Sequence, residues 1–321
     1  MNADYTLRIA CLGLAVFFLA HLGCGLAISL AAGPIVRLLA RQRARFAARV
    51  TFALRMLPAT GALFLVAVFC VPSYLRFEPD ADQESIGLFC IAAALAGLSI
   101  LSLAWIRAVR ATLQSARLVR DCRMNGHETR GASPILVVKD SSRLVALIGL
   151  TNPRIVVSAG AIGKLSISQL SAAIRHERAH HESRDNLKRL MLLLAPDLIP
   201  GWSGFDRLNA SWRRFTEWAA DDRACGGRAS RSLALADALV RMARLSASTR
   251  AASLATSLLA EDQELPTRVE RLLRNAPPAA PWNLSVRLCS AAVILFALCA
   301  VITIGLGGHE TIYGLLETLI D

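Results

Sequence analysis

Two histidines and a glutamate stand at a spacing that could bind and use a metal ion. The segment His176-Glu177-Arg178-Ala179-His180 has the pattern His-Glu-x-x-His. On a helix, residues four apart lie on one face, so the two imidazoles could meet at one ion. Zinc is the ion that such a pair typically holds, and Glu177 would then accept a proton from the attacking water. The pattern indicates metal-dependent hydrolysis.

The pentapeptide also occurs by chance on solvated helix faces, so a metal site needs a third ligand. Glu217 and Asp221 lie four apart on the next predicted helix and share a face. The Glu217 carboxylate would complete a His-His-Glu zinc site with a fourth position left for water. Asp221 would accept the free ring N–H of a ligating histidine. Solvated acidic residues are the alternative, and the succession of the two motifs favours the metal site.

The residues around the histidines predict the helix that must position them. Leu170, Ala173 and Ile174 form part of an apolar stripe at helical spacing, and neither proline nor glycine occurs between 167 and 195. Ser168 is the expected cap of this helix. The sequence therefore predicts helical structure on both sides of the motif.

A small sheet is predicted before this helix, and further helices follow it. Short β-branched runs occur at 134–138 and 155–158, and 144–150 is a third candidate strand. An edge strand could pair with an extended peptide, or the sheet could only support the helix, and both readings stay open. The later helices and a proline-rich linker are expected at 203–225, 231–259, 265–273 and 275–281.

The composition is too apolar for an ordinary soluble domain. Of the 321 residues, 54% are hydrophobic, and the mean hydropathy is +0.45. The runs long enough to cross a bilayer are 9–32, 57–74, 86–106 and 284–306. The first run is too long, and its flank too weakly charged, for a signal peptide. The run 190–200 is too short to span and predicts a buried or interfacial segment.

The charges orient the chain in the membrane. The net charge is +12, with arginine-rich segments at 37–49 and 107–123 and an acidic loop at 78–84. The positive-inside rule then places the basic segments in the cytoplasm and both termini outside. The basic segments would meet the anionic headgroups of the lipid bilayer. No recognition motif for nucleic acid accompanies the charge. None of the eight cysteines forms a Cys-x-x-Cys pair, so neither disulfides nor a cysteine zinc site is expected.

These observations predict three parts of the chain. Residues 1–106 would form three transmembrane helices with short loops. Residues 107–283 would form a cytoplasmic zinc metallopeptidase domain. Residues 284–321 would form a fourth transmembrane helix and a short external tail.

Several segments resemble the integral-membrane metallopeptidases of the BlaR1/MecR1 type, peptidase family M56, and more distantly the HtpX/Ste24 type, family M48. The segments that carry the resemblance are 149–158, 176–180, 184–186, 217–221 and 268–272. The resemblance implies a mainly α, polytopic membrane protein with four transmembrane helices. It also implies a cytoplasmic, gluzincin-like metallopeptidase domain that carries a small β-sheet. The external penicillin-sensing domain of these receptors is absent, so β-lactam sensing is not expected.

The resemblance also implies roles for individual residues. The zinc ligands would be His176, His180 and Glu217. The general base would be Glu177. The residues that support the ligands would be Asp221 and Asp185. The candidates for stabilising the oxyanion, which the sequence does not rank, are His181, Arg178 and Arg268. Arg178 departs from the family, which usually has an apolar side chain there.

The leading hypothesis is a zinc endopeptidase of the inner (cytoplasmic) membrane with its active site on the cytoplasmic side. Its substrate would be a cytoplasmic protein cleaved in an extended segment, for example a BlaI-like transcriptional repressor. One alternative is an HtpX-like quality-control protease that cleaves misfolded membrane proteins. Another is a non-catalytic receptor or scaffold, but a purely structural site would not need Glu177 as a base.

Overall fold

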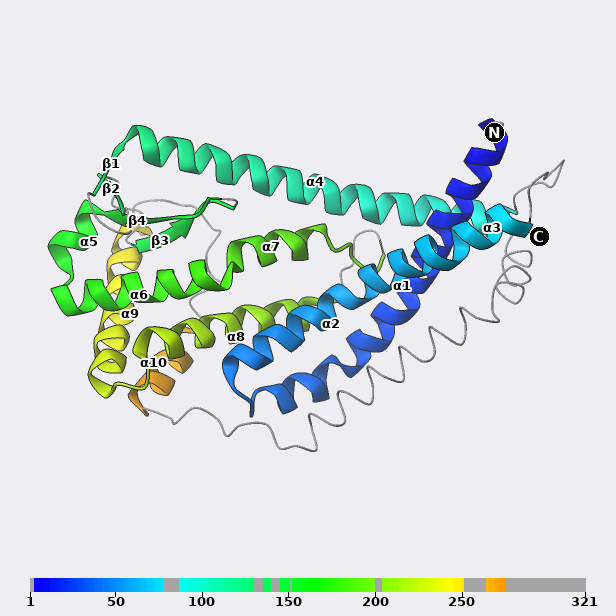
Figure 1. The fold of residues 1–321 in the computed structure, drawn as a ribbon. Helices are drawn as coiled ribbons and strands as arrows, with labels where there is room; N and C mark the ends of the chain where they lie inside the picture. The colour runs from blue at the N-terminus through cyan, green and yellow to red at the C-terminus, as the bar shows by residue number, and fades with distance from the viewer. Residues whose placement is uncertain are drawn as a thin grey trace.

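The computed structural model of the chain is mainly helical and carries one small sheet (Figure 1). It describes residues 3–77, 87–129, 135–139, 145–150, 152–199, 204–250 and 264–274. The elements are α1 (Ala3–Leu39), α2 (Ala44–Leu65), the π-helical turn η1 (Val66–Cys70), α3 (Val71–Phe77), α4 (Leu88–Met124), β1 (Gly126–Glu128), β2 (Leu136–Val138), β3 (Val145–Ile148), β4 (Arg154–Ser158), α5 (Ala159–Lys164), α6 (Ile167–Ser183), α7 (Asp185–Leu194), α8 (Asp206–Cys225), α9 (Ala229–Arg250) and α10 (Leu265–Leu273). The expected fourth span at 284–306, the linker at 275–281 and the acidic loop at 78–84 lie outside the described residues.

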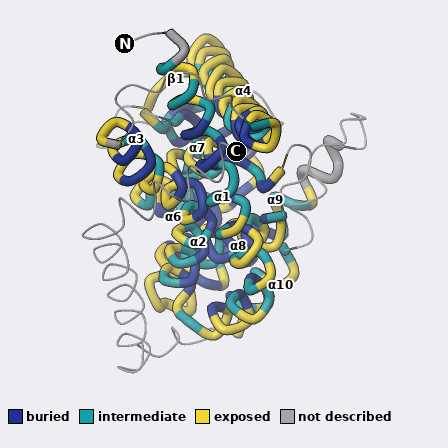
Figure 2. Tube along the Cα trace, turned by 90° about the vertical axis from the view of Figure 1, so that its right-hand side faces the viewer, coloured by how far each residue is buried: buried dark blue, intermediate teal, exposed yellow. Residues whose placement is uncertain are grey.

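Among the described residues, three helical rods are long and apolar enough to cross a membrane, which indicates a membrane protein. These candidate spans are Tyr5–Leu39, Ala44–Arg76 and Leu88–Met124, and they overlap the first three apolar runs of the sequence. At most 39% of the apolar window of each rod is buried within the protein. In Figure 2, α4 is exposed along most of its length. Such apolar outer surfaces are typical of helices that face lipid.

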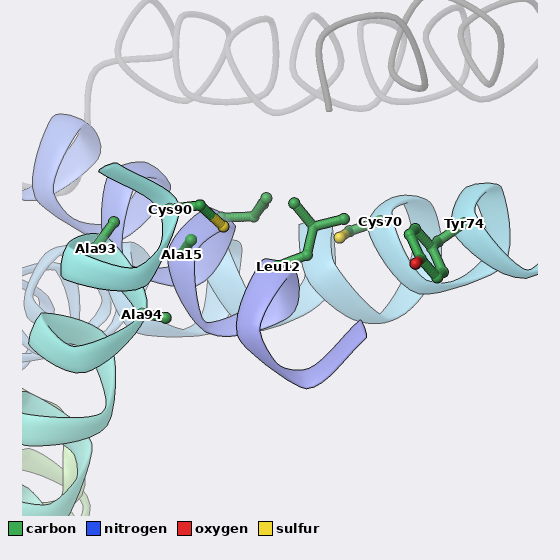
Figure 3. Close-up of a cluster of buried hydrophobic side chains, with 8 residues drawn as sticks. Leu12, Ala15, Cys70, Tyr74, Cys90, Ala93 and Ala94 are labelled. Atoms are coloured by element: carbon green, nitrogen blue, oxygen red, sulfur yellow. The ribbon is translucent and has the colours of Figure 1, made fainter. Parts of the chain in front are cut away.

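Small residues let α1 and α4 approach closely at their crossing. Ala15 of α1 and Ala93 and Ala94 of α4 are buried in one cluster, which Cys70 and Tyr74 also join (Figure 3). A Cβ atom at Gly97 would lie only 2.6 Å from the backbone oxygen of Leu14. Close backbone approach of this kind is a common way for membrane helices to associate.

The rod α4 splays away from α1 and α2; α7 lies between them, and the sheet, α5, α6, α9 and α10 lie toward their open end (Figure 1). In Figure 1, α4 runs along one side of the molecule and α1 and α2 run along the other. Helix α4 continues past residue 106, where the sequence suggested a domain boundary, and packs its last turns against the sheet through Leu118, Val119 and Cys122. On the opposite side, α8 packs against α1 and α2 through Phe215 and Leu208.

The sheet has the strand order β1-β2-β4-β3, with β3 at one edge. Strands β2 and β4 are parallel, and the two outer pairs are antiparallel. Because side chains alternate along a strand, Val156 faces the α4 side while Ile155 and Val157 face α6. The three expected strand regions are confirmed as β2, β3 and β4, and β1 is an additional strand.

The helix that carries the histidines begins and ends differently from the expectation. Ser166, not Ser168, is its cap: the Ser166 hydroxyl accepts from the Gln169 N–H, and the Gln169 side chain accepts from the Ser166 N–H. This reciprocal capping box satisfies two backbone donors at once, which a cap at Ser168 could not do here. The helix ends at Ser183, because Arg184 adopts a left-handed conformation with φ 54°.

The short segment after α7 lies between the three rods and is held there by polar contacts. Arg55 of α2 donates to the backbone oxygens of Ala195 and Pro196 at 3.0 and 3.1 Å. Arg107 of α4 pairs with the Asp197 carboxylate, and His21 Nε2 of α1 donates to the Asp197 carbonyl at 3.0 Å. Of the predicted segment 190–200, Ala195, Pro196 and Leu198 are buried, whereas residues 190–194 form the end of α7 with Met191 and Leu194 exposed. The polar contacts of residues 195–197 tie α7 to all three rods.

Candidate metal centre

Two neighbouring helices bring His176, His180 and Glu217 together. His176 and His180 lie one turn apart on α6, and Glu217 reaches them from α8. Glu217 Oε2 lies 3.3 Å from His176 Nε2, and Glu217 Oε1 lies 3.5 Å from His180 Nε2. One ligand atom from each residue lies within 4.8 Å of the others. Residues that are 37 to 41 positions apart in the chain thus form one cluster of potential metal ligands.

The donor set and its spacing fit a zinc ion. The two Nε2 atoms face each other at 3.1 Å, and the Glu217 carboxylate presents Oε2 to His176 and Oε1 to His180. Tetrahedral zinc with bonds of about 2.0–2.2 Å to nitrogen and oxygen places its ligand atoms about 3.3–3.6 Å apart. The Nε2–Nε2 separation of 3.1 Å and the separation of 3.3 Å between His176 Nε2 and Glu217 Oε2 are close to two of those edges. Two imidazoles and one carboxylate are also the ligands of several catalytic zinc sites.

Each histidine has a carboxylate at its other ring nitrogen. Asp221 Oδ1 lies 3.0 Å from His176 Nδ1, and Asp185 Oδ2 lies 2.9 Å from His180 Nδ1. Such partners select the tautomer that leaves Nε2 free for a metal. Both carboxylates suspected from the sequence therefore lie where they can orient a ligand.

The same carboxylates control the protonation of the imidazoles. Burial disfavours the charged form of His176, but Asp221 and Glu217 outweigh burial and raise its pKa to about 9. In the same way, Asp185 and Glu217 overcome burial and raise the pKa of His180 to about 10. Burial would raise the pKa of Glu217, yet the two histidines and Arg268 hold it well below its usual value. Protons and a metal ion therefore compete for this site.

Glu177 lines the same pocket as the three candidate ligands. Its carboxylate oxygen Oε2 accepts a hydrogen bond from the backbone N–H of Leu147 in β3, at 2.9 Å. Burial is the largest influence on Glu177 and raises its pKa. A carboxylate whose pKa is raised toward neutrality is a better general base than an ordinary glutamate. The contact with Leu147 has no sequence signal, because it is made by a backbone group 30 residues away.

Arg268 of α10 fixes the acidic residues of α8. It donates to both oxygens of Asp221, at 2.8 and 3.0 Å, and its Nη1 lies 2.9 Å from Glu217 Oε2. Among the three residues considered as oxyanion donors, Arg268 lines the pocket, whereas His181 and Arg178 are exposed. The exposure of Arg178 explains why a charged residue is tolerated there. Arg268 thus contacts the candidate ligand Glu217 and its neighbour Asp221, an arrangement that the sequence pattern did not reveal.

The pocket at the cluster has a volume of about 380 Å³ and is open to an edge of the sheet. Val145, Ala146 and Leu147 of the edge strand β3 line it, together with side chains of α9 such as Leu239. The Asn186 side-chain amide holds the strand by donating to the backbone oxygens of Leu147 and Gly149 at 3.3 and 2.8 Å. Asn186 follows Asp185 directly, so the turn after α6 supports both His180 and the strand.

Comparison with known families agrees with this chemistry. The family model Peptidase_M48, described as peptidase family M48, matches residues 116–291. These residues are more than half of the chain and include every member of the cluster. Searches of curated proteins and of solved structures gave no match. The stronger sequence resemblance, to the M56 type, is not confirmed; the chain belongs to peptidase family M48.

Proposed function

We propose that this membrane-associated metallopeptidase is a zinc endopeptidase in which His176, His180 and Glu217 hold the ion. The observation that carries the proposal is the meeting of three ligand atoms within 4.8 Å, beside Glu177, in one pocket. Peptidases of family M48 are typically zinc-dependent, which supports the choice of metal. When bound, zinc would supply Lewis-acid polarisation of the scissile carbonyl and activation of the attacking water.

Glu177 is the general base in this proposal. Its carboxylate accepts a proton from the attacking water and later passes that proton to the leaving amine, so the group ends the cycle as it began. Leu147 N–H holds one carboxylate oxygen, which orients the group within the pocket. The raised pKa of Glu177 supports both halves of the transfer, since a group with a pKa nearer neutrality can accept and release a proton readily.

Asp221, Asp185 and Arg268 position the ligands in the proposed enzyme. Asp185 orients His180 through a hydrogen bond of 2.9 Å, and Asp221 lies 3.0 Å from His176 Nδ1 as a charged neighbour. Arg268 neutralises part of the negative charge of Glu217 and Asp221 and holds both carboxylates in place. An extended substrate segment is proposed to lie beside β3, because this edge strand lines the pocket. Glu177 and Asn186 already engage the Leu147 N–H and the Leu147 and Gly149 carbonyls, so pairing would use the backbone of Val145.

Membership of family M48 favours the HtpX-like role, the cleavage of misfolded membrane proteins, over repressor cleavage. The proposed setting is the inner membrane, with residues 107–283 and the active site on the cytoplasmic side and with both termini outside. The arginine-rich segments at 37–49 and 107–123 support this orientation through the positive-inside rule. Cleavage of a BlaI-like repressor is the second, M56-type proposal, and its support is the sequence resemblance.

The test compares cells that carry the wild type with cells that carry Glu177→Gln. Loss of a general base should lower proteolysis about 10²–10⁴-fold, while the purified variant keeps its zinc. Glu270→Gln is the matched control, because this exposed glutamate pairs with Arg274 and lies outside the pocket. Proteomics of new protein N-termini gives the cleavage, and elemental analysis gives the zinc content.

The outcome also separates the competing roles. New N-termini in membrane proteins support quality control, and a cleaved repressor supports signalling. A wild type that holds no zinc, or a Glu177→Gln variant that cleaves as well as the wild type, overturns the proposed mechanism. Identical N-termini in both cell lines would be the result for a non-catalytic scaffold.

A further inference from the structure

A second pocket lies next to the metal centre and has no part in the proposed hydrolysis. Its volume is about 240 Å³, and it shares Asp185 and Thr216 with the pocket of the metal centre. We call it the basic pocket, after its four cationic lining residues Arg45, Arg49, Lys188 and Arg223. They come from α2, α7 and α8, so the pocket forms only when these three helices are packed together.

Positive charge exceeds negative charge around the basic pocket. The four cations face two carboxylates, Glu182 and Asp185, which leaves a balance of two positive charges. Arg223 pairs with Glu182, and Lys188 pairs with Asp185, both at 3.0 Å. In the part of the chain that the structure describes, no carboxylate pairs with Arg45 or Arg49. The charges of Arg49 and Arg223 both act on Arg45, so an anion placed among them would relieve repulsion.

A buried hydroxyl is also without a partner at this pocket. Thr216 is only 7% exposed, and its Oγ1 has no hydrogen-bond partner among the described residues. A buried hydroxyl without a partner costs free energy, and a ligand oxygen or an ordered water can remove that cost. The combination of unpaired arginines and an unpartnered hydroxyl points to a ligand with several acceptor oxygens.

We propose that the basic pocket binds a phosphate group, carried by a small free anion or by a lipid headgroup. Phosphate offers double negative charge and several acceptor oxygens, which match the planar donor forks of arginine. The volume of about 240 Å³ suits a single phosphate-bearing group. Arg49 lies eight residues before residue 57, where the second apolar run begins, and eight helical residues span about 12 Å. A headgroup at the membrane surface is therefore within reach of the pocket.

The test measures phosphate binding by the full-length, zinc-loaded protein in detergent, at constant ionic strength. Inorganic phosphate is the first probe, and calorimetry measures its binding. Phosphatidic acid in phosphatidylcholine nanodiscs is the second, with bound lipid counted by native mass spectrometry. Arg45→Ala/Arg49→Ala should weaken binding of the effective probe by about tenfold or more, because two charge-assisted contacts are lost. Both side chains are exposed, so the variant should melt like the wild type without the probe.

The control is Arg241→Ala/Arg244→Ala, which removes two exposed arginines of α9 that lie outside the pocket and outside the arginine-rich segments. It should bind like the wild type, and Arg49→Gln alone should show a partial loss. If the double variant Arg45→Ala/Arg49→Ala loses only the binding of inorganic phosphate, the ligand is a free anion. If it loses only the binding of phosphatidic acid, the ligand is a lipid. Phosphate could also bind at the metal, so the double variant decides: equal binding of both probes by it and by the wild type overturns the proposal. Failure of the wild type to bind either probe does the same.

Discussion

Zinc affinity should depend strongly on Asp185, which touches the metal site through a single hydrogen bond. Its Oδ2 lies 2.9 Å from His180 Nδ1, and its side chain is 11% exposed, so solvent screens the contact little. A hydrogen bond to a charged partner contributes about 1.5–3 kcal/mol, and its loss in Asp185→Ala corresponds to about 10–100-fold weaker zinc binding. Asp185→Asn keeps a neutral hydrogen bond of roughly half that strength, so its zinc affinity should fall only about 3–10-fold.

The assay is a competition between the purified protein and a chromophoric zinc chelator, with circular dichroism to verify that each variant is folded. Asp222→Ala is the matched control. Asp222 lies on α8 beside Asp221, but its carboxylate pairs with Arg271 at 2.6 Å rather than with a histidine. Zinc affinity should therefore stay at the wild-type value in the control. The reasoning fails if Asp185→Ala binds zinc as tightly as the wild type, or if Asp222→Ala loses as much.

Three further predictions concern protonation, packing and capping. Zinc must displace protons from His176 and His180, whose pKa values without metal are about 9 and about 10, so affinity should rise with pH up to that range. The stability of the metal-free protein should change with pH in the opposite direction. Stabilisation by the charged imidazoles is complete below about pH 6.5 and is lost as the pH rises through 9 to 10. Zinc titrations and melting curves across pH check both, and flat profiles would contradict them. Phe205→Ala should lower the free energy of unfolding by about 3–5 kcal/mol, because Phe205 is fully buried among α1, α2 and α8. Unfolding by denaturing detergent measures this change. A loss below about 1 kcal/mol, as at a surface position, would contradict the prediction. Ser166→Ala should cost about 1 kcal/mol in the same assay, and Ser168→Ala should cost less, since Ser166 is the cap.

The features that the sequence predicted well depend on contacts between near neighbours. The spacing of His176 and His180 needs only one turn of helix to bring both imidazoles to one face. Apolar runs predicted the three long helices, and alternation with turn residues predicted three strands of the sheet. The short amphipathic helix at 265–273 was predicted with the bounds that it has in the structure.

The local errors have a tertiary cause. The region 167–195 contains neither proline nor glycine, so no break was expected, yet Arg184 is left-handed and separates α6 from α7. This turn allows Asp185 to reach His180 and Asn186 to reach the carbonyls of β3. Long-range contacts favour the turn, and local propensity does not register them.

The sequence by itself determined the chemistry that is available, and the tertiary structure decided how that chemistry is arranged. Residue types and helical spacing identified the two histidines, Glu177 and the acidic pair of α8 as members of one candidate site. Only the folded chain shows Leu147 N–H on Glu177 and Arg268 across Glu217 and Asp221. Those partners are 30 to 51 residues apart in the chain, and the packing of a strand and a late helix brings them together. Helical and strand periodicity carries no information about contacts at such separations, because it reports only which face of an element is buried.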